Sequence, residues 1–328
     1  MQTGLTLTAD KTGRQVCVVV VKGTFVIAAD GRTRLDEQQM PPTPSDVFWG
    51  DPEKSAIRYE SDFALRKPRV DVILNGHAHT PEGRAATRVA VAFEIGPVRK
   101  TIMVFGDRRW QKGTLGLRIG DPTPFVTMPL VWDRAFGGID RSNPDPAKQG
   151  AELRNLVGTG YTRSGRSAAE GLRLPNLEDP RSLIASLSDR PPPIGCGSVG
   201  RGWQPRISRA GTYDKRWRTG RCPLLPEDFN DLFFQSAPDD QQLSAVEGMS
   251  VRCLNLTRAG GLSFRVPRGE VTISFLMKTG PQRLVGVLDT VIIEPDERRL
   301  LLTWRASVPL GRKRSHLRAI EIDARIEP

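Results

Sequence analysis

The chain has 328 residues, more than one hydrophobic core usually holds, and its 32 Gly and 26 Pro favour short strands and turns over helices. Lys and Arg outnumber Asp and Glu by 48 to 37, a formal charge of +11, but the basic residues lie in short, separated clusters. That dispersion excludes the long basic block of a nucleic-acid-binding arm. The longest apolar run, residues 16–21, is far too short to span a bilayer.

The four cysteines, Cys17, Cys196, Cys222 and Cys253, are isolated from one another in the sequence. No C-x-x-C pair occurs, which excludes a zinc ribbon and a thioredoxin-like redox pair, and we expect buried free thiols in a reducing compartment. The N-terminal residues lack an apolar segment after a basic one, so no signal peptide is expected. These features predict a cytoplasmic protein that does not associate with membranes.

The sequence pattern of residues 1–132 predicts an N-terminal lobe of antiparallel strands. Residues 14–28 are rich in β-branched side chains and predict one long or two consecutive buried strands. Residues 85–94 and 98–105 predict a hairpin about Gly96 and Pro97. A β-sandwich or open barrel would bury the apolar faces of such strands.

Residues 133–245 predict a long irregular Gly/Pro-rich connection, because neither helical nor strand periodicity persists there. One short helix is predicted over residues 226–236. A proline suits its first position, two acidic residues follow, and Phe229, Leu232 and Phe233 fall at helical spacing. We expect these three side chains to form the buried face of the helix.

The sequence pattern of residues 246–328 predicts a C-terminal β lobe that packs on the N-terminal lobe. The predicted strands cover residues 251–258, 262–266, 271–277, 283–293, 299–308 and 317–326, with turns that include Glu294-Pro295-Asp296. The predicted fold is therefore mainly β: two antiparallel β-sandwich-like lobes joined by the irregular segment, with one or two short helices.

Residues 195–200, Gly-Cys-Gly-Ser-Val-Gly, match the G-x-G-x-x-G pattern of dinucleotide-binding sites. That chemistry requires a strand before the glycines and a helix N-terminus after them. Three prolines precede this run, and Arg201-Gly202-Trp203-Gln204-Pro205 follows it, which does not propagate a helix. We therefore expect neither a dinucleotide nor any other cofactor.

No catalytic constellation emerges from the sequence, and we expect a protein that is not an enzyme. The alternative is a metal-dependent hydrolase that uses His77, His79 and Asp71. His77 and His79 are two residues apart and would share one face of a strand, but a metal site needs a third ligand and an open position. A side chain exposed to solvent is the simpler interpretation of each histidine, so no metal site is predicted.

The stretch after residue 195 is rich in Arg, Trp and Tyr, the residues that dominate binding hot spots. The residues predicted to contact a partner are Arg201, Trp203, Arg206, Tyr213, Asp214, Arg216 and Trp217. The alternative is an internal role, in which guanidinium groups stack on aromatic rings and hold the loop together. Direct nucleic-acid binding is not favoured, because it rests on the positive charge alone.

Several motifs spread over nearly the whole chain together resemble a known family. They include Gly106-Asp107-Arg108 with Trp110, Trp132-Asp133-Arg134-Ala135-Phe136, Leu174-Pro175-Asn176-Leu177-Glu178, Trp203-Gln204-Pro205-Arg206, Ala210-Gly211-Thr212-Tyr213-Asp214 and Ala237-Pro238-Asp239-Asp240-Gln241, which are specific as a set. They are similar to a domain-of-unknown-function family encoded beside type VI secretion effectors in Gram-negative bacteria. The resemblance implies an adaptor or chaperone that holds a secreted toxic effector and helps to load it onto the VgrG spike with its PAAR-type tip. It implies no catalytic residues.

Overall fold

The computed structural model describes residues 1–52, 54–114, 116–163, 169–278, 280–310 and 317–327. It confirms that the protein is mainly β, with 44% strand and 8% helix. The one α-helix of these residues is α1 (Lys215–Gly220), and the short 3₁₀ turns are Pro81–Gly83, Trp132–Arg134, Pro146–Lys148, Arg206–Arg209, Asp231–Phe234 and Asp239–Gln241. Within the described ranges, no helix combines the length and apolar character that a membrane span requires.

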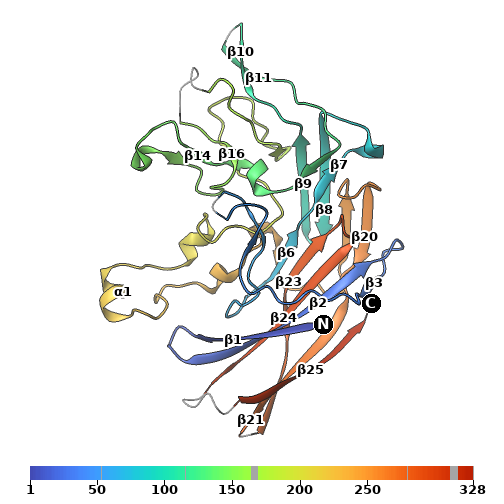
Figure 1. Ribbon diagram of the computed structural model, residues 1–328, viewed down its shortest axis with the longest axis vertical. Helices are drawn as coiled ribbons and strands as arrows, with labels where there is room; N and C mark the ends of the chain where they lie inside the picture. Colours follow the sequence, from blue (N-terminus) through green and yellow to red (C-terminus); the bar gives the residue numbers. More distant parts are fainter. Residues whose placement is uncertain (53, 115, 164–168, 279, 311–316, 328) are drawn as a thin grey trace.

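A seven-stranded sheet forms the centre of the molecule (Figure 1). Its strands run in the order β1 (Gln2–Ala9), β2 (Gln15–Ile27), β24 (Arg299–Pro309), β23 (Val287–Glu294), β6 (Val70–Leu74) and β18 (Gln242–Leu243), and β3 (Thr33–Leu35) also pairs with β2. The long strand predicted over residues 14–28 is confirmed as β2.

The central strands of this sheet are buried on both faces. Val19 and Val21 of β2 belong to the main core, whereas Val18 and Val20, on the opposite face, pack against Phe63. Strands covered on both sides read as continuous apolar runs rather than as alternating ones, which explains the unbroken valines of β2.

A five-stranded sheet faces the central one across the main core, to which both sheets contribute. Its order is β17 (Leu177–Glu178), β9 (Val98–Phe105), β8 (Arg88–Ile95), β19 (Ser250–Leu254) and β20 (Gly261–Arg265). The predicted hairpin is confirmed as β8 and β9, whose register ends at Ile95 and Val98 around the intervening turn.

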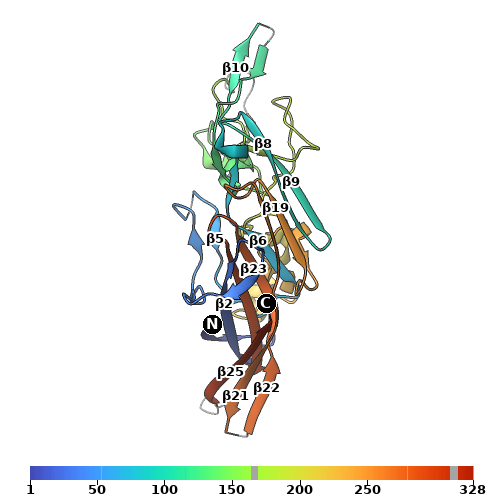
Figure 2. The same ribbon diagram turned by 90° about the vertical axis from the view of Figure 1, so that its right-hand side faces the viewer.

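The remaining strands extend the molecule at its two ends (Figure 2). A three-stranded sheet of β22 (Gly280–Val285), β21 (Arg268–Met277) and β25 (Leu317–Glu327) lies at one end, and β10 lies at the other. The two-stranded pairs are β10 (Trp110–Gly113) with β11 (Gly116–Ile119), β12 (Thr127–Pro129) with β7 (His77–His79), β13 (Phe136–Gly137) with β16 (Thr159–Gly160), β14 (Ile139–Asp140) with β15 (Gly150–Ala151), and β4 (Val47–Phe48) with β5 (Ile57–Tyr59).

The two large sheets each combine strands from residues 1–132 and 246–328, so the predicted division into two separate lobes is not confirmed. β6 comes from the N-terminal part and pairs in parallel with β23 from the C-terminal part. β8, from the N-terminal part, pairs with β19, from the C-terminal part, and this pairing is antiparallel. The expectation of purely antiparallel lobes therefore fails at β6, because hydrophobic periodicity reports the buried face of a strand and not its neighbour.

The prediction of a helix over residues 226–236 is wrong in extent and type. The structure has one 3₁₀ turn there, Asp231–Phe234, and the Asn230 side chain caps it by accepting from the Leu232 amide. Phe229 packs against the rings of Phe233 and Phe234, so the apolar contacts form without an α-helix. The α-helix instead lies at Lys215–Gly220, in a stretch predicted to be irregular.

Three of the four cysteines are buried free thiols, as expected, whereas Cys222 is exposed. Burial raises the pKa of Cys196 to about 11 and that of Cys253 to about 12. A thiol with so high a pKa is almost entirely protonated at neutral pH and is a poor nucleophile.

A buried carboxylate, Asp71 on β6, joins the central sheet to the segment that follows α1. Its oxygens accept from the Lys67 ammonium at 2.7 Å, the Gln235 side chain at 2.8 Å, and the amides of Ser236 and Ala237 at 2.8 and 3.1 Å. Lys67 also donates to Thr290 on β23 at 3.0 Å. Asp71 is completely buried, so all of its acceptor capacity is met by protein groups.

Asp71→Asn is expected to lower the free energy of unfolding by about 3–5 kcal/mol, because it removes the carboxylate that forms a buried ion pair with the Lys67 ammonium. Urea denaturation followed by circular dichroism measures the change. Asp323→Asn is the control, since its ion pair with Arg325 is exposed and should contribute little. Equal changes in both variants would contradict the role given to Asp71.

Candidate functional site

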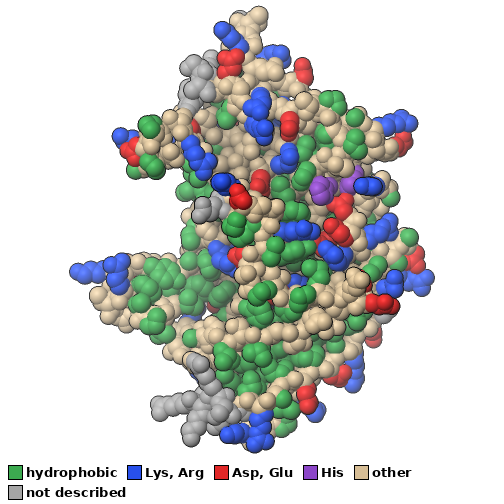
Figure 3. All heavy atoms as spheres, viewed as in Figure 1, with side chains coloured by type: hydrophobic (Ala, Val, Ile, Leu, Met, Phe, Trp, Pro, Cys, Tyr) green, Lys and Arg blue, Asp and Glu red, His purple; other side chains and the backbone are tan. Residues whose placement is uncertain are grey.

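The α1 surface consists of Tyr213, Lys215, Arg216, Trp217 and Arg218. Asp214 caps the N-terminus of the helix, and its side chain accepts from the Trp217 amide at 2.8 Å. The rings of Tyr213 and Trp217 meet edge to face with their centroids 4.7 Å apart. The segment that carries α1 projects from the body of the molecule, and basic side chains gather at its tip (Figures 1 and 3).

Among the residues that the structure describes, the cations of the α1 surface form no ion pair. Lys215, Arg216 and Arg218 are exposed, and none makes a side-chain hydrogen bond or ion pair within the described residues. Tyr213 is 49% exposed. The surface therefore combines two aromatic rings with three exposed positive charges that make no ion pair in the described structure, although Asp214, Glu227 and Asp228 line the same hollow as Arg216 and Trp217.

Of the other residues predicted to contact a partner, Trp203 and Arg206 lie deeper, whereas the Arg201 side chain is 44% exposed. Trp203 and Arg206 are only 7% and 3% exposed. Arg206 donates to Glu60 at 2.6 Å, and Arg201, half-exposed, bonds to Asp46 at 2.5 Å. Trp203 and Arg206 thus help to hold the loop together, which is the internal role that the sequence offered as an alternative to partner binding. Among the predicted residues of the α1 surface, Tyr213 and Arg216 are exposed and form no ion pair in the described structure.

The glycines of residues 195–200 provide space for two tryptophan rings. Trp132 and Trp203 pack edge to face with centroids 5.9 Å apart, and the Trp132 indole donates to the Gly197 carbonyl at 3.0 Å. A Cβ on Gly195 would lie 2.9 Å from the Trp132 ring, and one on Gly200 would lie 2.7 Å from the Trp203 ring. The glycines at residues 195 and 200 are therefore needed for the packing of the two rings and do not indicate a dinucleotide site.

Most residues of the resemblance motifs form internal contacts. Arg134 donates to Asn176 at 2.9 Å, and Asn176 donates to Asp107 at 3.0 Å. Arg108 pairs with the buried Glu178 and stacks on a phenylalanine ring. Together these contacts fasten the segment before β17 to the end of β9.

The remaining motif residues also form contacts within the protein. Gln241 is completely buried and donates to the carbonyls of residues 72 and 196 at 2.7 and 3.1 Å. Asp239 pairs with Arg209 at 2.6 Å. Trp110 and Phe136 share one small apolar cluster, and Asp133 accepts from the Ala56 amide at 3.1 Å.

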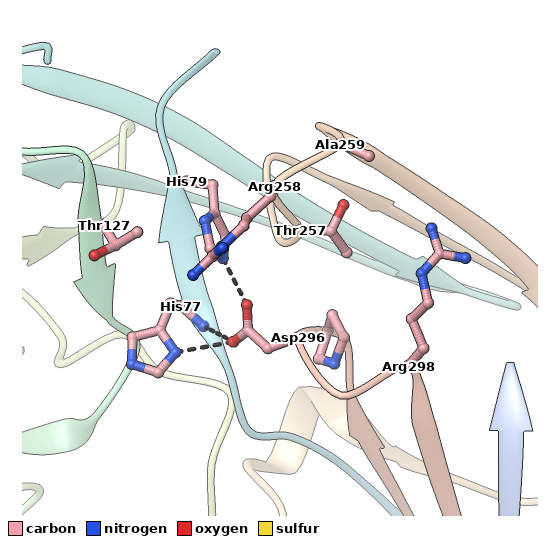
Figure 4. Close-up of a pocket in the computed structure, with 9 residues that line it drawn as sticks. His77, His79, Thr127, Thr257, Arg258, Ala259, Asp296 and Arg298 are labelled. Carbon is pink, nitrogen blue, oxygen red and sulfur yellow. Dashed lines mark hydrogen bonds and ion pairs between the residues drawn. The ribbon is translucent and has the colours of Figure 1, made fainter. Parts of the chain in front are cut away.

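The two histidines of β7 meet a carboxylate that the sequence did not identify. His77 Nδ1 lies 2.8 Å from one oxygen of Asp296, and His79 Nε2 lies 2.6 Å from the other (Figure 4). Asp296 comes from the turn between β23 and β24, which the sequence predicts only as a turn. Nothing in the local sequence pairs it with a histidine 217 residues away.

Asp71, the third residue of the hydrolase alternative, does not reach this pair, because it is buried against Lys67 and residues 235–237. In the part of the chain that the structure describes, no group of three His, Cys, Asp or Glu side chains is arranged to hold a metal ion. The alternative based on His77, His79 and Asp71 therefore lacks its third ligand.

The hydrogen bond to Asp296 raises the pKa of His77, with burial acting against it and the charges of Asp296 and Glu297 adding to it. Burial raises the pKa of Asp296, but the two histidine bonds outweigh burial and lower it. His77 is thus protonated over a wider pH range than a free histidine, and Asp296 is ionised between the two rings.

Gly200→Ala is expected to lower the free energy of unfolding by about 1–3 kcal/mol, because the added methyl group would overlap the Trp203 ring. Gly202→Ala is the matched control, since no atom lies within 4 Å of the position of its Cβ. Thermal or urea unfolding compares the two variants. Similar stability would show that the ring does not need this glycine.

An NMR titration is expected to give His77 a midpoint above the ordinary value of about 6.5, and Asp296→Asn is expected to lower it. His77→Gln assigns the signal. Because the folded-state pKa is raised, the stabilising contribution of His77 is complete below about pH 6.5 and is lost as the pH rises through the folded-state value. An unchanged midpoint in Asp296→Asn would disprove the assigned cause.

Comparison with known proteins identifies a family but no relative of known function. The sequence model of uncharacterized proteins conserved in bacteria (DUF2169) matches residues 12–305. No curated protein and no solved structure is significantly similar to the chain. Because the match covers most of the chain, including the α1 surface, the chain belongs to the DUF2169 family of uncharacterized bacterial proteins.

Proposed function

We propose that this protein is a non-enzymatic adaptor that binds an acidic segment of a partner protein through its α1 surface. The observation that carries this proposal is the combination, on one projecting segment, of two aromatic rings with Lys215, Arg216 and Arg218, which are exposed and form no ion pair with any residue that the structure describes. Interface hot spots favour Tyr, Trp and Arg, because these side chains join large apolar area to polar ends. Uncompensated charge supplies specificity and speeds association with a partner of opposite charge.

The internal contacts of the motif residues support an adaptor rather than an enzyme. Asp107, Arg134, Asp239 and Gln241 are engaged with neighbouring protein groups, so they hold the irregular segments to the sheets. A catalytic site would instead need a nucleophile or base in reach of a second reactive group. The buried thiols of Cys196 and Cys253 have pKa values raised by burial, so they stay protonated and are unsuited to nucleophilic attack.

The partner that we propose is a secreted toxic effector of a type VI secretion system, which the adaptor helps to load onto a VgrG spike or its PAAR-type tip in the cytoplasm. The motifs around Trp132, Trp203 and Asp214 support this assignment through their resemblance to proteins encoded beside such effectors. Exposed edge strands such as β1 offer a second kind of contact, the addition of an extended partner strand.

Capture of the tagged protein from its own cells, followed by mass spectrometry, is expected to recover a toxin or spike component. With that partner purified, reversing the charges of Lys215, Arg216 and Arg218 to Glu should weaken binding by about tenfold or more, measured by calorimetry. The three side chains are exposed, so the variant should retain its circular dichroism spectrum and melting temperature.

The matched control reverses Arg34, Lys112 and Arg252, which are also exposed and unpaired in the described structure but lie elsewhere. It changes the net charge equally and should bind normally. Equal losses in the two triple variants would show that only net charge matters. Capture of nucleic acid alone, removed by high salt, would refute the adaptor function.

A further inference from the structure

The first strand of the central sheet is unpaired along one side. β1 ends the seven-stranded sheet and pairs only with β2, in an unbroken register that places Leu5 opposite Val19 (Figure 1). No other backbone hydrogen bond joins residues 2–9 to any residue that the structure describes. Alternate residues of an antiparallel strand direct both backbone groups away from the neighbouring strand. About half of the amides and carbonyls of β1 therefore face outward without a partner in the described structure.

The other edges of the three largest sheets are protected against pairing. Natural sheets protect an edge by a short strand, by charged side chains or by proline. β3, β17 and β18 are only two or three residues long, and β20 ends in Arg265. β22 contains Pro281 and Arg283, and β25 carries five charged side chains. β1 is eight residues long and contains neither a charge nor a proline, so it is the edge best suited to pairing with another strand.

One face of β1 is apolar and exposed at the margin of the core. Leu5 and Leu7 lie opposite two residues of β2 that are buried in the main core, Val19 and Cys17. Leu5 is nevertheless 55% exposed and Leu7 44%. Apolar side chains gather on this part of the molecule, where β1 and β25 lie (Figures 1 and 3). The apolar face of the central sheet thus continues to its margin, where the described residues leave it partly uncovered.

The opposite face of β1 is held against the body of the molecule. A Cβ on Gly4 would lie 2.7 Å from the ring of Phe63, so the strand and this ring are in close contact. The same ring packs on Val18 and Val20 of β2. Because β1 is fixed both by its pairing with β2 and by this contact, its free edge is already in the extended conformation that a further strand requires.

We propose that β1 pairs antiparallel with β1 of a second copy of this chain, which joins the two central sheets into one. The sequence of β1 is self-complementary about Thr6. With Thr6 of each copy on the two-fold axis, Leu5 lies opposite Leu7 of the partner subunit, and Gly4 lies opposite Thr8 of the partner subunit. The leucines then cover one another on one face, and no like charges meet across the pair.

Other registers satisfy the leucines less well. A shift by two residues in one direction places Leu7 opposite Thr3 of the partner subunit, and a shift in the other direction places Leu5 opposite Ala9 of the partner subunit. Only the register centred on Thr6 pairs both leucines with leucines. This pairing uses no residue of the α1 surface, so the inference does not depend on the proposed adaptor function.

Sedimentation velocity of the full-length protein at increasing concentrations is expected to show a monomer that converts to a dimer. Leu5→Glu combined with Leu7→Glu places like charges across the two-fold axis and should weaken the dimer by about tenfold or more. Leu153→Glu combined with Leu183→Glu is the matched control, because these leucines are 57% and 46% exposed and lie outside β1. Equal weakening in both variants would refute the pairing through β1, and circular dichroism checks that each variant is folded.

Leu5→Lys combined with Leu7→Glu in the same chain tests the register. Each lysine then lies opposite a glutamate of the other copy, so the dimer should form more strongly than in the variant with two glutamates. A dimer that stays equally weak would refute the register centred on Thr6. Both variants change the same two side chains, so a difference between them reports the cross-strand pair and not the loss of the leucines.

Hydrogen exchange locates the interface in the unmodified protein. The amides of residues 2–9 should exchange more slowly as the protein concentration rises, because the outward ones become bonded in the dimer. A protein that remains monomeric at every concentration would overturn the proposal. Protection of β1 only after addition of another protein would also overturn it and would assign the edge to a strand of that protein.

Discussion

The carboxylate of Asp71 is the interaction on which the arrangement of this molecule most depends. It lies on β6, the strand that enters the central sheet in parallel with β23, and it is saturated by Lys67 and by groups of residues 235–237. Lys67 extends the network to β23 through Thr290. One buried ion pair therefore joins two strands of distant sequence and fixes the segment that follows the projecting α1. A network of this kind is stable only when every member is satisfied.

Tight packing of glycine against tryptophan complements this polar network. Gly195 and Gly200 allow Trp132 and Trp203 to approach the backbone, and the two rings contact each other. The irregular segment is thus held by side-chain packing and hydrogen bonds where ladder bonds are few. Because the Trp132 and Trp203 rings contact other parts of the protein, they are not available to a partner. The residues that can contact a partner project beyond the loop, around Tyr213 and Trp217.

The α1 surface projects from the body of the molecule, with cations at its tip beside aromatic rings. It is the surface that we propose for an acidic protein segment.

The β-branched run of residues 15–27 determines a buried strand, and the turn between residues 95 and 98 determines a hairpin, because both signals are local. The sequence also indicated an aromatic and basic segment with a role in contacts. Only the tertiary structure decided that Trp203 lies inside while Trp217 borders solvent, that β6 lies beside β23, and that Asp296 meets the histidines. Periodicity reports which face of a segment is buried, whereas pairing and convergence arise from contacts between residues more than a hundred positions apart.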